Sequence, residues 1–228
     1  MSTWMKVARA HLVGGFNFFA YPWMILALDF VIAIVVNAAV AGSKNGYSGA
    51  VFGIYAAFLA IGVISVVRWL PFGLAVGISR RAYFIGVGWL ALALSAVDGL
   101  ALTLLQGLES VTNGWGSKLH FFRVPYILAG PWYLTWLTSF VLLTVCFVWG
   151  MWFGIVYRRW NLFGLMAFII VQILLLTLGV AIATTAHAWT SIGHFFTTLS
   201  VTGLTGLVAL LGLFLFTGGL ATIRRVTV

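Results

Sequence analysis

The sequence predicts an all-α integral membrane protein with six transmembrane helices, an N-terminal interfacial amphipathic helix and both termini in the cytoplasm. Three observations predict this class. Of the 228 residues, 63% are hydrophobic and only 7% are charged, whereas soluble domains contain about 25% charged residues. Six apolar runs are each long enough to cross a bilayer, which takes about 20 residues. The basic residues gather on one side of those runs.

The first predicted element is a short amphipathic helix over residues 3–16. Its apolar residues recur at helical spacing and its basic residues lie off that stripe, with Trp4, Val7, Ala8 and Leu12 on one face and Lys6 and Arg9 outside it. Such a helix lies in the plane of the membrane interface. We expect the segment to be retained, because the apolar run that follows is longer than the apolar region of a signal peptide, which is about 7–15 residues.

The six predicted spans follow in order at about 20–41, 49–67, 83–105, 132–156, 162–185 and 201–221. Each is apolar without interruption over about 20 residues, whereas the strand of a membrane barrel alternates over about 10. The links are short and contain turn-forming residues such as Pro71 and Gly130. The sequence therefore predicts a single transmembrane domain over residues 1–228.

The orientation follows from the basic residues, since Lys and Arg in short loops stay in the cytoplasm. Of the 12 basic residues, nine lie in the N-terminal segment, the links between spans two and three and between spans four and five, and the C-terminal segment: Lys6, Arg9, Arg68, Arg80, Arg81, Arg158, Arg159, Arg224 and Arg225. Only Lys44, Lys118 and Arg123 lie on the other side. We expect membrane lipids as partners, because the basic patches attract anionic headgroups. No concentrated basic face exists, so we expect no nucleic-acid partner.

The motifs of catalysis are missing from this sequence. It contains neither His-Glu-x-x-His nor a phosphate-binding Gly-x-x-x-x-Gly-Lys-Ser/Thr loop, and its single cysteine, Cys146, lies alone in a span. His187 and His194 are seven residues apart but lack the third ligand that a zinc site takes. We expect no catalytic residue, no metal and no cofactor on this chain.

Two acids lie inside predicted spans, Asp29 in the first and Asp98 in the third. An ionised carboxylate at the bilayer centre costs on the order of 3 kcal/mol, so such a residue faces a partner, a cavity or a pathway. Gln172 in the fifth span lies at the depth of Asp29 and is a candidate hydrogen-bond partner. Two interpretations stay open: these are packing groups, or Asp29, Asp98 and Gln172 belong to a substrate or proton pathway.

Four features occur together along the chain. They are the interfacial helix at 4–16, the compact link 71–81 with the run Pro-Phe-Gly-Leu-Ala-Val-Gly-Ile-Ser-Arg-Arg, the basic link Tyr-Arg-Arg-Trp at 157–160, and the partly apolar outer segment 187–200. Together they resemble the six-span permease subunits of bacterial ATP-binding-cassette (ABC) exporters, of the kind grouped as type V. The resemblance implies a multi-pass protein of the bacterial cytoplasmic membrane.

In such exporters the link between spans two and three is a coupling helix that lies in a groove of a separate ATPase subunit. The resemblance thus implies that this subunit carries the ATP and Mg, and that it contacts Phe72, Leu74, Ile78, Arg80 and Arg81. It further implies a second permease, either a copy or a paralogue. An outer gate is implied at His187, Trp189, His194 and Phe196.

The scarcity of polar residues in the spans suggests an amphipathic or hydrophobic cargo, such as a lipid, a peptide or an antibiotic, moved outward by alternating access. The long outer link at 106–130, which contains Glu109, is a further candidate for contact with substrate. Two alternatives stay open. The first is the substrate-capturing membrane subunit of an importer. The second is an accessory or immunity protein that transports nothing.

Overall fold

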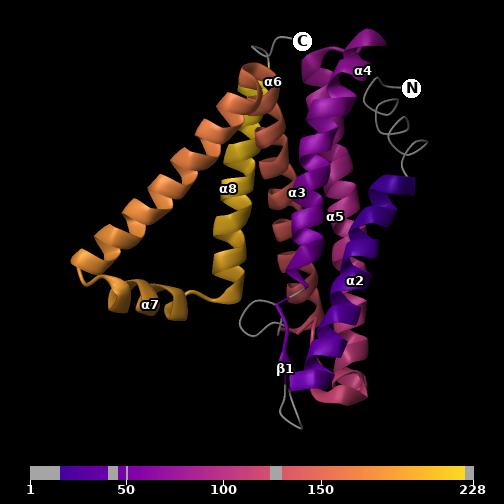
Figure 1. Ribbon diagram of the computed structural model, residues 1–228, viewed down its shortest axis with the longest axis vertical. Coiled ribbons are helices and arrows are strands. Elements are labelled where there is room, and N and C mark those ends of the chain that lie inside the picture. Colours follow the sequence, from indigo (N-terminus) through magenta and orange to yellow (C-terminus); the bar gives the residue numbers. More distant parts are fainter. Residues whose placement is uncertain (1–15, 41–45, 50, 124–129, 224–228) are drawn as a thin grey trace.

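The computed structural model describes residues 16–40, 46–49, 51–123 and 130–223. This part of the chain is helical apart from one pair of two-residue strands (Figure 1). Its elements are α2 (Phe16–Val40), β1 (Gly46–Tyr47), α3 (Phe52–Ile64), η1 (Ser65–Trp69), α4 (Leu70–Ala75), α5 (Arg80–Val111), η2 (Gly114–Lys118), β2 (Leu119–His120), α6 (Trp132–Thr185), α7 (Trp189–Thr198) and α8 (Val201–Thr222). The predicted interfacial helix lies outside the described residues, except for Phe16.

Several of these helices are long and apolar enough to cross a membrane, which identifies the chain as a membrane protein. In the described part there are five: Ala20–Ala39, Phe52–Ala75, Arg80–Val111, Trp132–Thr185 and Val201–Thr222. The predicted runs at 20–41, 49–67, 83–105 and 201–221 each fall largely within one of them. The runs at 132–156 and 162–185 both belong to α6.

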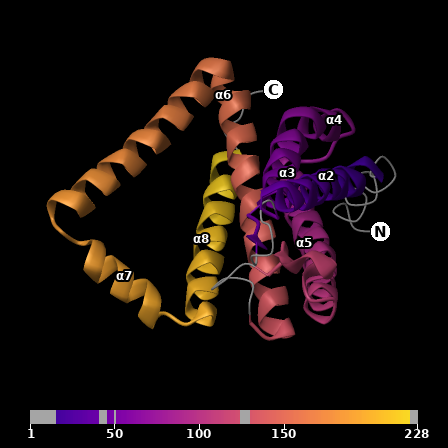
Figure 2. The same ribbon diagram turned by 60° about the horizontal axis from the view of Figure 1, so that its bottom comes forward.

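Helix α6 bends at Asn161, where φ is 54° and ψ is −157°. The bend divides it into a first arm over residues 132–160 and a second arm over residues 162–185, which diverge (Figure 2). Gly164 makes the turn possible, because a Cβ at that position would overlap the Cβ of Trp160. The expected basic link at 157–160 is therefore the last turn of a helix.

The first arm of α6 packs in a bundle with α2, α3 and α5, while the second arm leaves it (Figure 1). Two glycines bring α3 and α6 into backbone contact. A Cβ on Gly62 would overlap the carbonyl oxygen of Phe147, and a Cβ on Gly150 would overlap that of Leu59. Gly150 and Gly154, four residues apart on α6, thus allow close packing of helices within this chain.

The second helical run is longer than predicted. It continues from α3 through a π-helical turn, η1, into α4 without a break in the helix. Pro71 lies in the first turn of α4, directly after the π-helical turn, and the helix continues across it. A reversal at Gly77, whose φ is 84°, then leads into α5, and the Ser79 side chain caps that helix by accepting from the backbone N–H of Ala82 at 3.2 Å.

Candidate functional site

An apolar pocket of about 390 Å³ lies between α5, the first arm of α6 and α8. Its lining includes Trp89, Leu92, Phe140, Thr144, Val148 and Phe216. The one hydroxyl among these six, that of Thr144, donates to the carbonyl oxygen of Phe140 at 2.8 Å. A ligand of this pocket would therefore be held by shape and apolar contact, as an acyl chain or a lipophilic ring system is.

Two glycines set the shape of this pocket. The ring of Phe216 on α8 lies over Gly88 on α5, where an added Cβ would be 2.6 Å from the ring. Val145 of α6 lies against Gly212 of α8, where an added Cβ would be 2.7 Å away. Because both contacts use the space of a missing side chain, α8 approaches α5 and α6 closely on the two sides of the pocket.

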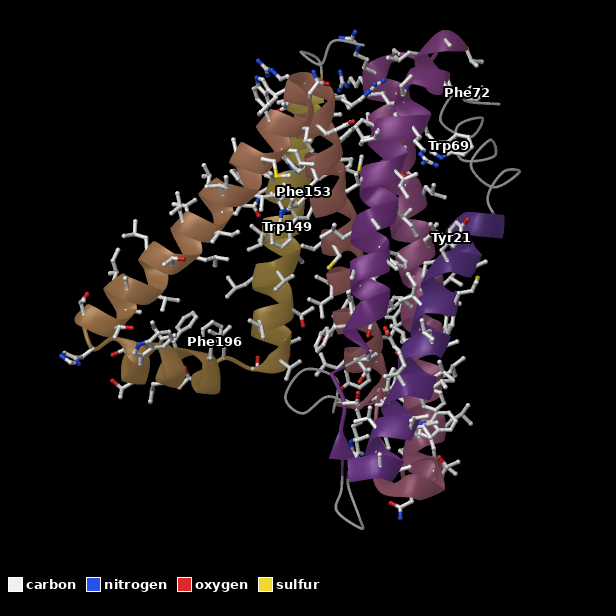
Figure 3. All side chains as sticks on the ribbon, viewed as in Figure 1. Tyr21, Trp69, Phe72, Trp149, Phe153 and Phe196 are labelled. Atoms are coloured by element: carbon white, nitrogen blue, oxygen red, sulfur yellow. The ribbon has the colours of Figure 1, made fainter. Side chains whose placement is uncertain are left out.

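The second arm of α6 is exposed along nearly its whole length. Side chains in its middle are more than half exposed, including Leu174 at 61% and Leu176 at 71%. Close to the bend, the rings of Phe153 and Phe168 meet edge to face at 5.3 Å and join the two arms. Figure 3 shows Trp149 and Phe153 on the side of the first arm toward α8 and the second arm. In a bilayer this apolar arm is covered by lipid or by another apolar protein surface.

The predicted outer gate residues lie on α7 and the turn that precedes it. His187 has a φ of 48° in this turn, and the Trp189 indole N–H donates to the Thr184 hydroxyl at 3.1 Å. Phe196 is 55% exposed and packs against Phe195. Helix α7 joins the far end of the second arm to α8 (Figure 1). Its place is compatible with a gate, although nothing in the geometry selects these four residues over their neighbours.

Asp98 is buried, with 1% of its surface exposed, at the contact between α5 and α2. Its carboxylate accepts a hydrogen bond from the indole N–H of Trp23 at 3.0 Å. No Lys or Arg forms an ion pair with it within the described residues. Asp98 therefore joins two helices of the bundle and lies apart from the residues that line the apolar pocket.

Asp29 and Gln172, predicted to share a hydrogen bond, are not brought together. The Asp29 carboxylate lies against Gly53 of α3, where a Cβ would overlap one of its oxygens. Gln172 is on the second arm of α6, and its side-chain amide nitrogen has no hydrogen-bond partner in the described chain. The hydrogen bond was predicted because the two residues lie at the same depth in the membrane. Depth does not indicate which helices are neighbours.

The predicted ATPase-facing residues divide into two groups. Phe72 is 56% exposed at the end of the molecule where α4 lies (Figure 3), and Arg81 is exposed in the first turn of α5. Leu74 and Ile78 instead pack against the hydrophobic core, and Arg80 is half-buried. The pattern missed Val76, which is 65% exposed beside Phe72. Only the outward-facing members of this set are available to a partner protein.

Glu109 has the most extensive set of contacts among the acids of the chain. It is 1% exposed, and its carboxylate accepts hydrogen bonds from the backbone N–H groups of Phe121, Phe122 and Arg123 at 2.8–3.2 Å. The indole N–H of Trp115 donates to it at 3.3 Å, and His120 Nδ1 lies 3.7 Å away. Glu109 is therefore a structural centre of the outer link, which argues against contact with substrate.

A lone acid just before a turn-forming run, Asn113-Gly114-Trp115-Gly116, is the sequence signal that could have indicated this role of Glu109. In the described residues, no group of three or more His, Cys, Asp or Glu side chains is placed to hold a metal ion.

No protein-family model, curated protein or solved structure matches the chain.

Proposed function

We propose that this chain is the permease subunit of an ABC exporter that moves an amphipathic or hydrophobic substrate outward. The observation that supports this most is the apolar pocket of about 390 Å³ that lies between α5, α6 and α8. A helical membrane bundle with such a pocket, and with its buried acids Asp98 and Glu109 used in structural contacts, is suited to guiding an apolar molecule and offers little to a polar solute.

The proposal includes six crossings of the membrane, with the two arms of α6 counted separately. The second arm contains 24 residues from 162 to 185, enough for one crossing at about 1.5 Å per residue. The end of the bundle that contains α4 and the α6 bend is then cytoplasmic by the positive-inside rule. Its basic residues include Arg68, Arg81, Arg158 and Arg159. The two termini lie on the same side in this arrangement.

Energy for transport would come from a separate ATPase subunit that binds ATP and Mg. Phe72 and Val76 are both more than half exposed at the α4 end and form an apolar contact surface. Arg81, close to them in sequence, adds an exposed positive charge. Because α4 is continuous with α3 through η1, a displacement of α4 would be carried directly into the bundle. Alternating access would follow from such a displacement in two permease subunits that face each other.

The test is co-purification of the tagged full-length chain from its native membrane. We expect an ATPase of the ABC class to co-purify, and to be lost when Phe72 and Arg81 are replaced together by Ala and Glu. Arg123→Glu, at the other end of the bundle, is the matched control and should retain the ATPase. The ATPase activity of the complex should then rise with lipids or lipophilic drugs.

Other outcomes would overturn the proposal. Tight retention of a vitamin-like ligand by the isolated chain, without an ATPase, would identify the substrate-capturing subunit of an importer. Co-purification of a partner with no ATPase activity would identify an accessory or immunity protein. Stimulation by small polar solutes and none by lipids would refute the apolar cargo.

A further inference from the structure

The bend of α6 brings together cationic and apolar side chains. Arg158 and Arg159 end the first arm, and the guanidinium carbon of Arg159 lies 4.5 Å from the ring centroid of Trp160, a cation–π contact. Beyond Asn161, Leu162 and Phe163 are 55% and 90% exposed. Positive charge and exposed apolar surface thus lie next to each other within six residues of sequence, 158–163.

Arg158 lies on the face of α6 that packs against the α3 side of the bundle. It follows Gly150 and Gly154 at intervals of four residues, and Gly154 is in contact with Val66 of η1. The Arg158 side chain is half-buried, and its Nε is fully covered without a hydrogen-bond partner in the described chain. A covered guanidinium nitrogen without an acceptor is costly, and an anion that reaches the same group would offset that cost.

The chain cannot supply that anion from its own side chains. Its three acids are Asp29, Asp98 and Glu109. Asp98 is paired with Trp23, Glu109 is enclosed by the outer link, and Asp29 lies against Gly53. Within the described residues neither Arg158 nor Arg159 forms an ion pair. Among the described residues, therefore, no acidic side chain supplies a counter-ion at the bend.

We propose that the bend of α6 is a binding site for an anionic phospholipid of the leaflet at that end. Arg158 and Arg159 would contact the phosphate, while Trp160, Leu162 and Phe163 would lie at the boundary between headgroups and acyl chains. An acidic protein surface fits less well, because it would leave Phe163, 90% exposed, beside water. The site needs no ATPase and so does not depend on the proposed transport function.

The test measures lipid affinity of the full chain in neutral detergent by native mass spectrometry. Phosphatidylglycerol and phosphatidylcholine with identical acyl chains are titrated separately, and phosphatidylglycerol should bind more tightly. Arg158→Gln should weaken phosphatidylglycerol binding about tenfold, the effect of removing one charge-assisted hydrogen-bonding group. Arg159→Gln removes the neighbouring half-buried charge and should weaken binding too, so the proposal can still be tested if Arg158→Gln misfolds.

The matched control is Arg123→Gln, which removes one exposed guanidinium from the opposite end of the bundle and should leave the affinity unchanged. Equal affinity for the two lipids, or unchanged phosphatidylglycerol binding in both glutamine variants, would overturn the proposal. Displacement of the lipid by millimolar inorganic phosphate would show a free-phosphate site and would also overturn it. Tighter binding of an acidic protein than of lipid at Arg158 would do the same.

Discussion

The indole N–H of Trp23 on α2 donates a 3.0 Å hydrogen bond to the carboxylate of Asp98 on α5, 75 residues further along the chain. The bond explains how an acid that is 1% exposed is accommodated in an apolar bundle. It also gives Asp98 a structural role, the first of the two interpretations that the sequence left open. Helix α2 is thereby attached to α5 by a polar contact between apolar surfaces.

Replacement of Trp23 by Phe should destabilise the protein by about 1 kcal/mol through the lost bond, with a further loss from the smaller ring. The physical reason is that Asp98 keeps its buried carboxyl group but loses its donor. Thermal unfolding of the purified chain in detergent measures the effect. Trp89→Phe is the control, since Trp89 is 58% exposed, and should have a smaller effect. Equal effects of the two substitutions would contradict the assigned role.

Replacement of Glu109 by Gln should loosen the outer link. The amide keeps the shape of the carboxylate but places an NH₂ group among the N–H donors of Phe121, Phe122 and Arg123. At least one buried N–H then lacks an acceptor, at a cost of about 1–3 kcal/mol. Hydrogen exchange at residues 121–123 should become faster. Ser110→Ala, which changes an exposed neighbour, should leave that exchange unaltered, and unchanged protection in Glu109→Gln would refute the prediction.

A methyl group added at Gly150 should separate α3 from α6. A Cβ at this position would overlap the carbonyl of Leu59, so Gly150→Ala should cost about 1–3 kcal/mol of stability. Gly179→Ala is a matched control on the second arm of the same helix, where a Cβ meets nothing within 4 Å. It should be neutral or stabilising because Ala favours helix. Unfolding midpoints in detergent distinguish the two variants, and equal midpoints would argue against the α3–α6 contact.

The positions of the long helices could be predicted from the sequence, because each follows from the length of an apolar run. The run at 201–221 corresponds to α8 at Val201–Thr222, and the run at 20–41 to α2 at Phe16–Val40. The link after α3 was harder to predict, because Pro71 stands where proline does not break a helix. The sharp bend at Asn161 depends on one residue with positive φ, which hydropathy does not detect.

The hydrogen-bond partners of the buried polar residues could be predicted from the sequence only in part. Asp98 stood out as an acid in a span, but its donor Trp23 is one of 11 tryptophans, and no pattern distinguishes it from the others. The contacts of Glu109 require a run of four residues with positive φ, from Asn113 to Gly116. This run reverses the chain, and the three successive N–H groups that reach the carboxylate come from residues 121–123 beyond it, a return that hydropathy does not detect.

A larger side chain in the apolar pocket should reduce its occupancy by lipid. Ala209 lines the pocket from α8, so Ala209→Trp would fill part of the roughly 390 Å³ space. A phospholipid with a photoreactive diazirine in its acyl chain, activated in reconstituted vesicles and mapped by mass spectrometry, should label Trp89 and Phe216 in the wild type and much less in this variant.

Leu210→Trp provides the control for this experiment. It adds a side chain of the same kind one position along α8, at a residue that is 64% exposed and does not line the pocket, so labelling of Trp89 and Phe216 should persist. Bulk lipid would label all exposed apolar residues alike, whereas a bound acyl chain remains beside the lining long enough to react there preferentially. If labelling of Leu174 and Leu176 on the second arm equals that of the pocket in the wild type, the pocket has no preference for an acyl chain and the main support for an apolar cargo is lost.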